Sequence, residues 1–561
     1  MRLRGRTRAA GGPRIPLLAG LVVALLAAIA LTIGHHQPRP AVAPRVAIAA
    51  ALRDPAVARV RAGSHWNRIT VTAIDHKLVH VSFLAHGQLV AEAALDRTGR
   101  VLSQVNDRVM PVPYGNWIAY QPAVLAALCV LFVLMAGVTP WRRLRNLDVA
   151  AMLAFLPSVV LFQHRYLSAS MLAAAPVMTY MLLRCAQTAF GPARQAPPAR
   201  PLFVAITPGL DPARRVRCLR WLLLVLALVF VMVGAGSTDA VDVLYAAMEG
   251  ATKLLHGVLP YGHLPPGVIH GDTYPILSYV LYTPIALVAP VRNIWDSVNG
   301  GLALAVLAAL IAAAAVFRTI AGRRPAGSRR PPAAEEAALR AALSWLAFPP
   351  LLITVSTGTT DPMLAAMLAI ALLLWRRPSL CTGMLAAAGW FKLAPFALVP
   401  VALAPLRGRR LARALAAIGL VSLPLIGLLL ALGGLSGPAD MVHAMSYQFT
   451  RGSEQSVWDA LGIPGAQPLG QAGLLGLIAG AVVLLRRQPQ LAADPKRIAA
   501  LCAAILIGLQ LSADYWAFLY LAWVMPLIGC SVLSPHAAPE AAGERAALAT
   551  GRLEAAGALA A

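Results

Sequence analysis

Long apolar windows alternate with short basic clusters along most of the chain. Leu222–Thr238 contains no charged residue, and Leu411–Met441 contains only Arg413 and Asp440. Each window reaches the roughly 20 residues that cross about 30 Å of hydrocarbon as a helix. The pattern predicts an all-α polytopic membrane protein with about 12–14 transmembrane helices. The expected spans lie near Ile118–Val138, Val149–Phe162, Leu167–Cys185, Trp221–Gly236, Pro275–Pro290, Gly301–Phe317, Leu339–Val355, Pro362–Leu374, Leu411–Leu432, Gly470–Leu485, Ile498–Ser512 and Tyr515–Leu533.

The amino-terminal part of the chain departs from this pattern. Ile69–Thr72 and Val79–Phe83 alternate between apolar and polar residues, and Asp96–Gly99 has the composition of a turn. With an expected helix at Ala47–Ala62, they predict a small α+β domain. A basic start and the apolar run Ile15–Ile33 precede it. The run is long and no small-residue cleavage site follows it, so we expect an uncleaved membrane anchor that places the small domain on the extracytoplasmic side.

Composition agrees with a membrane protein. Of the 561 residues, 59% are hydrophobic, against about 45–50% in an ordinary soluble protein. The net charge of +25 lies in short clusters between apolar windows, which marks cytoplasmic loops and excludes nucleic acid as a partner. The six cysteines have no paired spacing and predict neither a disulfide framework nor a zinc site. The basic clusters are Arg2–Arg14, Arg142–Arg145, Arg194–Arg220, Arg323–Arg330, Arg376–Arg377, Arg407–Arg413 and Arg486–Arg497.

Assigning all basic clusters to the cytoplasmic side of the membrane leads to a contradiction. If Pro275–Pro290 and Gly301–Phe317 both cross the membrane, Arg323–Arg330 falls on the outer side. One of the two segments is therefore expected to be re-entrant. Leu380–Pro405 is expected to leave the cytoplasmic side and return to it, with Lys392 at its midpoint near the outer surface.

These patterns divide the chain into six parts. They are a cytoplasmic tail and anchor at 1–34, a small extracytoplasmic α+β domain at 35–117, transmembrane helices at 118–190, a Pro- and Arg-rich cytoplasmic linker at 191–220, a second transmembrane module at 221–533, and an Ala-rich cytoplasmic tail at 534–561. The extracytoplasmic loop 236–274 belongs to the fifth part.

The loop 236–274 concentrates ionisable residues at a membrane boundary. Acids are costly to place near hydrocarbon unless they have partners or a role. Val243–His256 has the pattern of an amphipathic helix lying on the membrane surface. The three nearby histidines lack the spacing of a usual metal site. The ionisable residues are Asp239, Asp242, Glu249, Lys253, His256, His263, His270 and Asp272.

Several motifs follow one another in a characteristic order. They are Asp242-x-x-Tyr245, Leu254-Leu255-His256-Gly257-x-x-Pro260-Tyr261-Gly262, Gly271-Asp272-Thr273-Tyr274-Pro275, Gly358-Thr359-Thr360-Asp361, Trp390-Phe391-Lys392-Leu393-Ala394-Pro395, and Arg451 with Ser456-Val457-Trp458-Asp459-Ala460-Leu461-Gly462. Over roughly Arg220–Leu533 this order resembles that of the GT-C glycosyltransferases, and is most similar to glycosyltransferase family 87 and the related DUF2029 proteins. The chain departs from that pattern at Thr359-Thr360-Asp361, where Gly-Gln-x-Asn is commoner, and in its additional amino-terminal part.

The resemblance implies an inverting, mannosyltransferase-like enzyme of a bacterial-type inner membrane, with its active site on the extracytoplasmic side. It would transfer a sugar from a polyprenyl-phosphate donor to the hydroxyl of a glycan or glycolipid acceptor. A carboxylate takes the proton of that hydroxyl, and a cation stabilises the departing phosphate. The resemblance makes no cofactor certain and leaves a divalent cation open. The implied residues are Asp242, Asp239 and Asp272 for catalysis, Lys392 and Arg451 for the donor phosphate, and Tyr245, Tyr261, Tyr274 and Trp458 for substrate.

Structural roles remain alternatives for the same residues. Asp239, Asp242 and Asp272 also suit helix amino termini, and Lys392 suits a side chain that extends to the membrane interface. Trp458 and Tyr261 suit interfacial anchors. A multi-pass transporter or an envelope-assembly protein is the alternative function, since many helices and a re-entrant segment are also typical of transporters.

Overall fold

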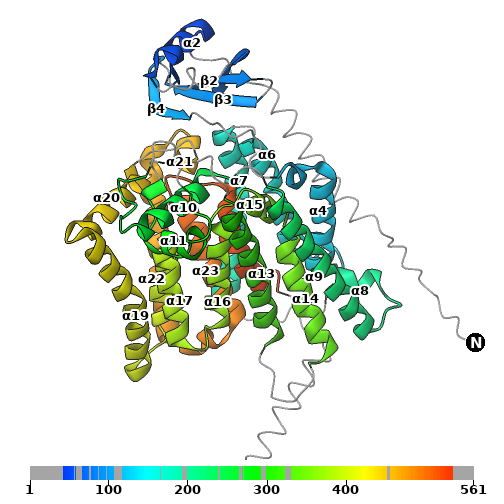
Figure 1. Cartoon of the computed structure of the whole chain (residues 1–561). Helices are drawn as coiled ribbons and strands as arrows, with labels where there is room; N and C mark the ends of the chain where they lie inside the picture. The colour runs from blue at the N-terminus through cyan, green and yellow to red at the C-terminus, as the bar shows by residue number, and fades with distance from the viewer. Residues whose placement is uncertain are drawn as a thin grey trace, which may run out of the picture.

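The protein consists of a small sheet and a much larger helical part (Figure 1). The structure is a computed structural model that describes residues 42–55, 57–58, 66–74, 78–85, 88–96, 98–106, 116–163, 166–191, 199–237, 240–264, 268, 271–291, 298–322, 330–450 and 455–534. The anchor expected at Ile15–Ile33 and nearly all of the expected tail lie outside these residues.

The sheet contains four antiparallel strands in the order β1-β2-β3-β4. The strands are β1 (Arg68–Ile74), β2 (Leu78–Ala85), β3 (Gln88–Leu95) and β4 (Val101–Asn106), and helix α2 (Pro44–Arg53) precedes them. On β2, the alternate residues Val79, Val81 and Phe83 are buried, as expected when one face of a strand meets a core. They share a small hydrophobic core with Ala47 and Ala51 of α2.

The helical part contains short helices as well as long ones. Its elements are η1 (Trp117–Tyr120), α4 (Pro122–Ala136), α5 (Leu144–Leu153), α6 (Leu156–Gln163), α7 (Leu167–Phe190), α8 (Leu202–Ile206), α9 (Pro212–Ala235), α10 (Asp242–Leu255), α11 (Leu277–Val280), α12 (Thr283–Ala286), α13 (Asn299–Ala321), α14 (Pro332–Leu346), α15 (Pro349–Ser356), α16 (Asp361–Leu373), α17 (Pro378–Phe391), η3 (Ala394–Leu398), α18 (Val399–Leu403), α19 (Gly408–Gly433), α20 (Ser436–Thr450), α21 (Val457–Ala460), η4 (Pro464–Ala466), α22 (Gln467–Arg487), η5 (Pro489–Ala493), α23 (Pro495–Ser512), η6 (Phe518–Tyr520) and α24 (Leu521–Cys530). Two-residue strands β5 (Val138–Thr139) and β6 (Arg200–Pro201) pair with each other.

The described residues include seven helices that are long and apolar enough to cross a membrane, or eight if the bent pair α14 and α15 forms one span. The chain is therefore an all-α polytopic membrane protein apart from its sheet. The expected 12–14 crossings refer to the whole chain, including the anchor outside the described residues. Within the described residues, several apolar windows form helices shorter than a full span. For example, the 13 residues of α16 extend about 20 Å, less than the roughly 30 Å of hydrocarbon.

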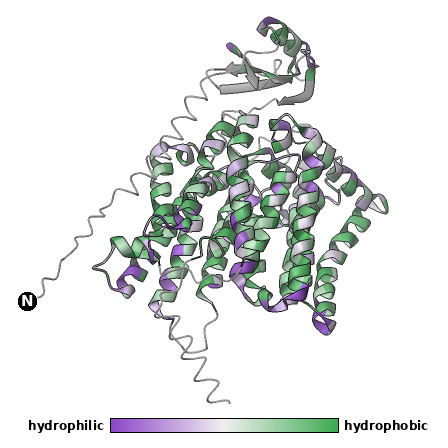
Figure 2. Cartoon of the chain, turned by 180° about the vertical axis from the view of Figure 1, so that it is seen from behind, coloured by the Kyte–Doolittle hydropathy of each residue, from purple (hydrophilic) through white to green (hydrophobic). Residues whose placement is uncertain are grey.

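Basic residues collect at the end of the helical part that lies away from the sheet. We call this the basic end, and the opposite end the site end. Helices α9, α14, α19 and α23 begin at the basic end, while α13, α16 and α22 end there, so the basic clusters next to these helix termini share one level. Figure 2 shows hydrophilic residues near the helix ends and mostly hydrophobic residues between them. This distribution is typical of a membrane protein.

The segment expected to span at Pro275–Pro290 does not form one helix. It contains α11 and α12, which have four residues each. It stays with α10 at the site end (Figure 1), and α13 then runs to the basic end. Arg318, in the last turn of α13, thus lies with the other basic residues. The conflict over the side of the following basic cluster therefore disappears, because Pro275–Pro290 does not run from one end of the helical part to the other.

Helix α10 differs from the expected amphipathic surface helix. The nine consecutive residues Leu244–Thr252 within this helix are all buried. A Cβ added to Gly250 would lie 2.3 Å from the ring of Tyr279, so the two elements pack in direct contact. The expected helix is present, but it is enclosed by protein because the following segment folds over it.

The turn between α15 and α16 depends on Gly358. Its φ of +70° is in the left-handed region, and an added Cβ would meet Leu244 Cδ2 at 2.6 Å and Leu302 Cδ2 at 2.9 Å. The main-chain N–H of Val241, just before α10, donates to the carbonyl of Thr357 at 2.9 Å. Gly358 therefore lets the start of α16 approach the start of α10 closely.

We predict that Gly358→Ala lowers the stability of the protein. The left-handed backbone and the lack of space should together cost about 2–4 kcal/mol, measurable as a lower thermal midpoint in detergent. Gly427→Ala is the matched control, because Gly427 lies within helix α19 with open space around it. An equal loss in both variants would contradict this account of Gly358.

Candidate functional site

Helices α16 and α17 bring Asp361 and Lys392 together inside the helical part. Asp361 is the first residue of α16, and Lys392 directly follows the last residue of α17. Both helices start or end near Arg376 and Arg377 at the basic end. With 13 and 14 residues, each extends about 20 Å from that end. Measured from these arginines, the two side chains therefore lie at about two thirds of the roughly 30 Å thickness of a hydrocarbon layer.

Lys392 and Asp361 form a buried ion pair. Lys392 Nζ lies 2.6 Å from Asp361 Oδ1, and the two residues are 5% and 2% exposed. Trp523 Nε1 of α24 donates to the same Oδ1 at 2.6 Å. Asp361 Oδ2 accepts no hydrogen bond from the residues that the structure describes. A buried charge requires a partner, and here each charge satisfies the other while one carboxylate oxygen stays open to a further donor.

Aromatic rings surround the ammonium group. Lys392 Nζ lies 5.2 Å from the ring centre of Trp523 and 5.4 Å from those of Tyr520 and Tyr274. Tyr520 stacks on Trp523 with ring centres 4.3 Å apart. At this distance a cation is attracted to the faces of aromatic rings. We call Lys392, Asp361 and these three rings the caged ion pair.

Hydrogen bonds hold the segment 271–275 against the caged ion pair. Tyr279 OH donates to the carbonyl of Gly271 at 2.6 Å, and Tyr261 OH donates to the carbonyl of Tyr274 at 3.2 Å. Gln448 Nε2, from α20, donates to Thr273 Oγ1 at 2.7 Å. Burial raises the pKa of Tyr261, and the charge of Asp272 adds to the shift. Its hydroxyl thus stays protonated and serves as a donor.

The proposed acids lie on this same part of the fold. Asp272 accepts a hydrogen bond from the main-chain N–H of Gly262 at 2.9 Å and is partly exposed. It is two residues from Tyr274 of the caged ion pair. Asp242 is exposed in the first turn of α10, where its Oδ1 accepts from the N–H of Val243 at 2.8 Å. This turn is joined to the α15–α16 turn through Val241. Asp239 lies outside the described residues.

The remaining predicted site residues are placed differently. Tyr245 is buried in the main hydrophobic core, and Tyr261 is also buried. The indole N–H of Trp458 donates to the carbonyl of Leu511 at 3.0 Å, and its ring packs where a side chain at Gly470 would clash. Trp458 therefore attaches α21 to α22 and α23. Arg451 lies outside the described residues.

No group of three or more His, Cys, Asp or Glu side chains that could hold a metal ion occurs within the described ranges. His256 Nδ1 lies 2.8 Å from the carbonyl of Thr252 in its own helical turn. His263 is exposed, and His270 is not described.

Sequence reasoning missed Asp361, Trp523 and Tyr520 as site residues. Asp361 was identified only as part of a motif. An acid between two apolar windows is itself a sign of a buried charge with a partner or a role. The aromatic partners come from residues more than 100 positions away and carry no local signal. Only Lys392 and Tyr274 of the caged ion pair were predicted.

Comparison with known proteins does not identify the chain: no family model matches it, and no curated protein matches it.

We predict that the two charges of the caged ion pair depend on each other. Lys392→Met leaves a buried carboxylate without its counter-ion, and Asp361→Leu leaves a buried ammonium. Each should cost about 3–5 kcal/mol. The double variant should cost less than either single variant, because no unpaired charge remains.

Thermal unfolding in detergent measures these differences. Arg220→Met is the control, since Arg220 pairs with Glu335 at 2.5 Å on the exposed surface and should contribute about 1 kcal/mol or less. Additive losses in the double variant would contradict the coupling.

Proposed function

We propose that the protein is a membrane glycosyltransferase that transfers a sugar, mannose-like in class, from a polyprenyl-phosphate donor to an acceptor hydroxyl on the extracytoplasmic side. The observation that carries the proposal is the caged ion pair at membrane depth, which includes Tyr274 of the segment that bears the partly exposed Asp272. The exposed Asp242 lies in the first turn of α10, which is joined to the α15–α16 turn before Asp361. The order of motifs from Asp242 to Gly462, which resembles that of GT-C glycosyltransferases, supports it from the sequence.

The depth of Lys392 suits a lipid-phosphate donor. The phosphate of such a donor is attached to a long apolar chain, and the charge that develops on it during transfer needs a cation in a site of low dielectric constant. Lys392 supplies such a cation, and Asp361 and the aromatic rings hold its ammonium group in place. The open Oδ2 of Asp361 leaves room for an acceptor or donor hydroxyl to bond there.

The distribution of charge supports the proposed side. Basic clusters favour the cytoplasmic face of a membrane protein, so the basic end is assigned to the cytoplasm and the site end to the outside, in a bacterial-type inner membrane. Nucleotide sugars are absent outside the cytoplasm, which favours a lipid-linked donor. The acceptor hydroxyl loses its proton to a carboxylate as it attacks. Asp242 is the first choice for this base and Asp239 the second, while Asp272 orients the acceptor or is itself the base.

Sugar transfer in isolated membranes tests the assignment. Membranes from cells with and without the protein are supplied with a labelled polyprenyl-phosphate sugar, and label in glycans and glycolipids is measured. Asp242→Asn or Asp272→Asn should reduce transfer by about 100-fold or more, as expected for the loss of a general base. Asp440→Asn is the control, because Asp440 is an exposed acid on α20 at the same end.

The thermal midpoint of each variant must stay near that of the parent protein for the comparison to hold. If the parent protein transfers sugar and neither asparagine variant is slower, the base is assigned wrongly. If the parent transfers no sugar from any lipid-phosphate donor, the proposed function itself fails.

One observation favours a second candidate, a transporter. Ionisable residues at membrane depth also mark solute and ion pathways, and the Lys392–Asp361 pair lies at such a depth. Flux of labelled solutes into vesicles that contain the purified protein distinguishes the two: flux without sugar transfer supports transport.

A further inference from the structure

A second group of buried charges lies at the basic end, far along the helices from the caged ion pair. Arg340 is in the third turn of α14 and is only 3% exposed. Its one ion pair is with Glu336, where Arg340 Nε lies 3.6 Å from Oε1, beyond hydrogen-bond distance. Arg340 Nε has no hydrogen-bond partner among the described residues. A buried guanidinium with unused donors is costly unless an acceptor binds it.

Glu336 is shared between Arg340 and a second arginine. Arg215 Nε of α9 lies 2.9 Å from Glu336 Oε2, with good hydrogen-bond geometry. Arg215 Nη1 donates to the carbonyl of Leu210 at 2.6 Å. Two guanidinium groups therefore share one carboxylate, and the contact of Arg340 with it is longer than that of Arg215.

Arg145 adds another positive charge to this region. It interacts electrostatically with Arg340, and its N–H groups donate to main-chain carbonyls of Ala136, Leu533 and Ser534 at 2.5–2.7 Å. The nearby carboxylate of Asp148 is bound by Arg184 and Tyr180. Arg145, Arg184, Arg215 and Arg340 thus have two carboxylate partners among the described residues, Asp148 and Glu336.

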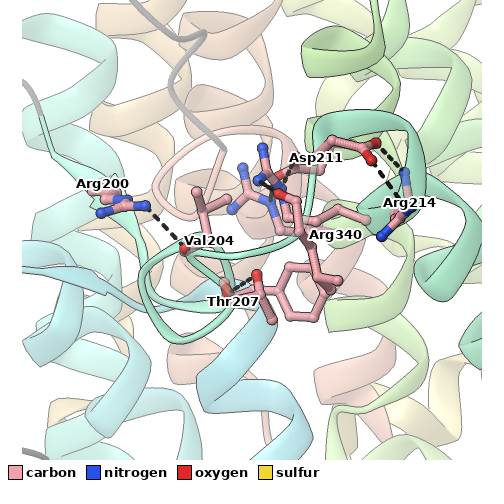
Figure 3. Close-up of polar contacts among 10 residues, drawn as sticks. Arg200, Val204, Thr207, Asp211, Arg214 and Arg340 are labelled. Atoms are coloured by element: carbon pink, nitrogen blue, oxygen red, sulfur yellow. Dashed lines mark hydrogen bonds and ion pairs between the residues drawn. The ribbon is translucent and has the colours of Figure 1, made fainter.

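The surroundings place this excess charge at a membrane interface. Figure 3 draws Arg340 with the turn between α8 and α9, where Arg214 pairs with Asp211 and Arg200 donates to the carbonyl of Val204. Large apolar side chains at the same end are exposed, as expected for groups that meet lipid at the level of the headgroups. They are Trp141, Leu144, Leu147, Ile206 and Trp221.

We propose that Arg340, with Arg145 and Arg215 beside it, binds a phosphate group at the basic end, in the membrane leaflet opposite to the caged ion pair. A guanidinium fork matches a phosphate in geometry and in charge. The phosphate belongs to the headgroup of an anionic phospholipid, or to a free phosphate ion. The exposed apolar side chains nearby favour the lipid. The site is independent of the sugar-transfer proposal, since none of its residues contacts the caged ion pair within the described ranges.

Lipid retention and thermal stability test this site in the full-length protein. The purified protein is placed in micelles that contain phosphatidylglycerol or phosphatidylcholine, and bound lipid is counted by native mass spectrometry. The parent protein should retain phosphatidylglycerol in preference. Arg340→Gln should weaken that retention by about 10-fold or more, which corresponds to the loss of a charge-assisted hydrogen bond. Arg220→Gln, an exposed arginine on α9, is the control and should change retention little.

The arms of the experiment separate the two sources of phosphate. The site is assigned to the free ion if millimolar inorganic phosphate raises the thermal midpoint of the parent protein but not that of Arg340→Gln, and displaces no lipid from the parent protein. Retention of phosphatidylglycerol that resists inorganic phosphate assigns it to the lipid.

Equal retention in Arg340→Gln and the parent protein would overturn the proposal. So would a parent protein that neither prefers phosphatidylglycerol nor is stabilised by inorganic phosphate, and this measurement needs no variant. If Arg340→Gln fails to fold, the add-back of phosphatidylglycerol to lipid-stripped parent protein decides the question through its thermal midpoint.

Discussion

The ion pair between Lys392 and Asp361 is the interaction on which the rest of the site depends. Neither charge is stable alone in a membrane interior, so the start of α16 and the end of α17 must meet. The tight turn at Gly358 lets the same start of α16 lie against the start of α10. Trp523 then reaches Asp361 from α24, and the rings of Tyr274 and Tyr520 cover the ammonium. Hydrogen bonds from Tyr261, Tyr279 and Gln448 hold the segment 271–275 in place. This segment connects the partly exposed Asp272 to Tyr274 of the caged ion pair.

Much of the fold follows from hydrophobic pattern and charge. The long apolar windows correspond to helices such as α7, α13 and α19, and the grouping of basic residues already indicated that one of two neighbouring segments does not cross. Helix length was harder to anticipate. Apolar residues inside a helix hairpin look the same as residues that face lipid, so α16 was not distinguished from a complete span. For the same reason, amphipathic pattern placed α10 on the membrane surface, whereas Gly250 and Tyr279 bury it in protein.

The candidate site was only partly predictable. Lys392 was conspicuous because lysine is rare in this chain and interrupts an apolar window, and Tyr274 was identified through its motif. Asp361 and Trp523 meet Lys392 only through tertiary contacts that join three distant stretches of sequence. Arg340 was equally hidden, because its significance lies in the hydrogen bonds that it lacks among the described residues rather than in its position along the chain.

The length of the α16–α17 hairpin also has an electrical consequence. A site about 20 Å from the basic end leaves roughly one third of a 30 Å hydrocarbon layer above it. A transmembrane potential acts on each elementary charge with about 2.3 kcal/mol per 100 mV across the whole layer. With the basic end in the cytoplasm, a singly charged anion that descends to Lys392 therefore works against about 0.8 kcal/mol per 100 mV of interior-negative potential. The Lys392–Asp361 pair carries no net charge and is nearly insensitive to that field, so the membrane voltage weakens the approach of an anion without disturbing the group that receives it.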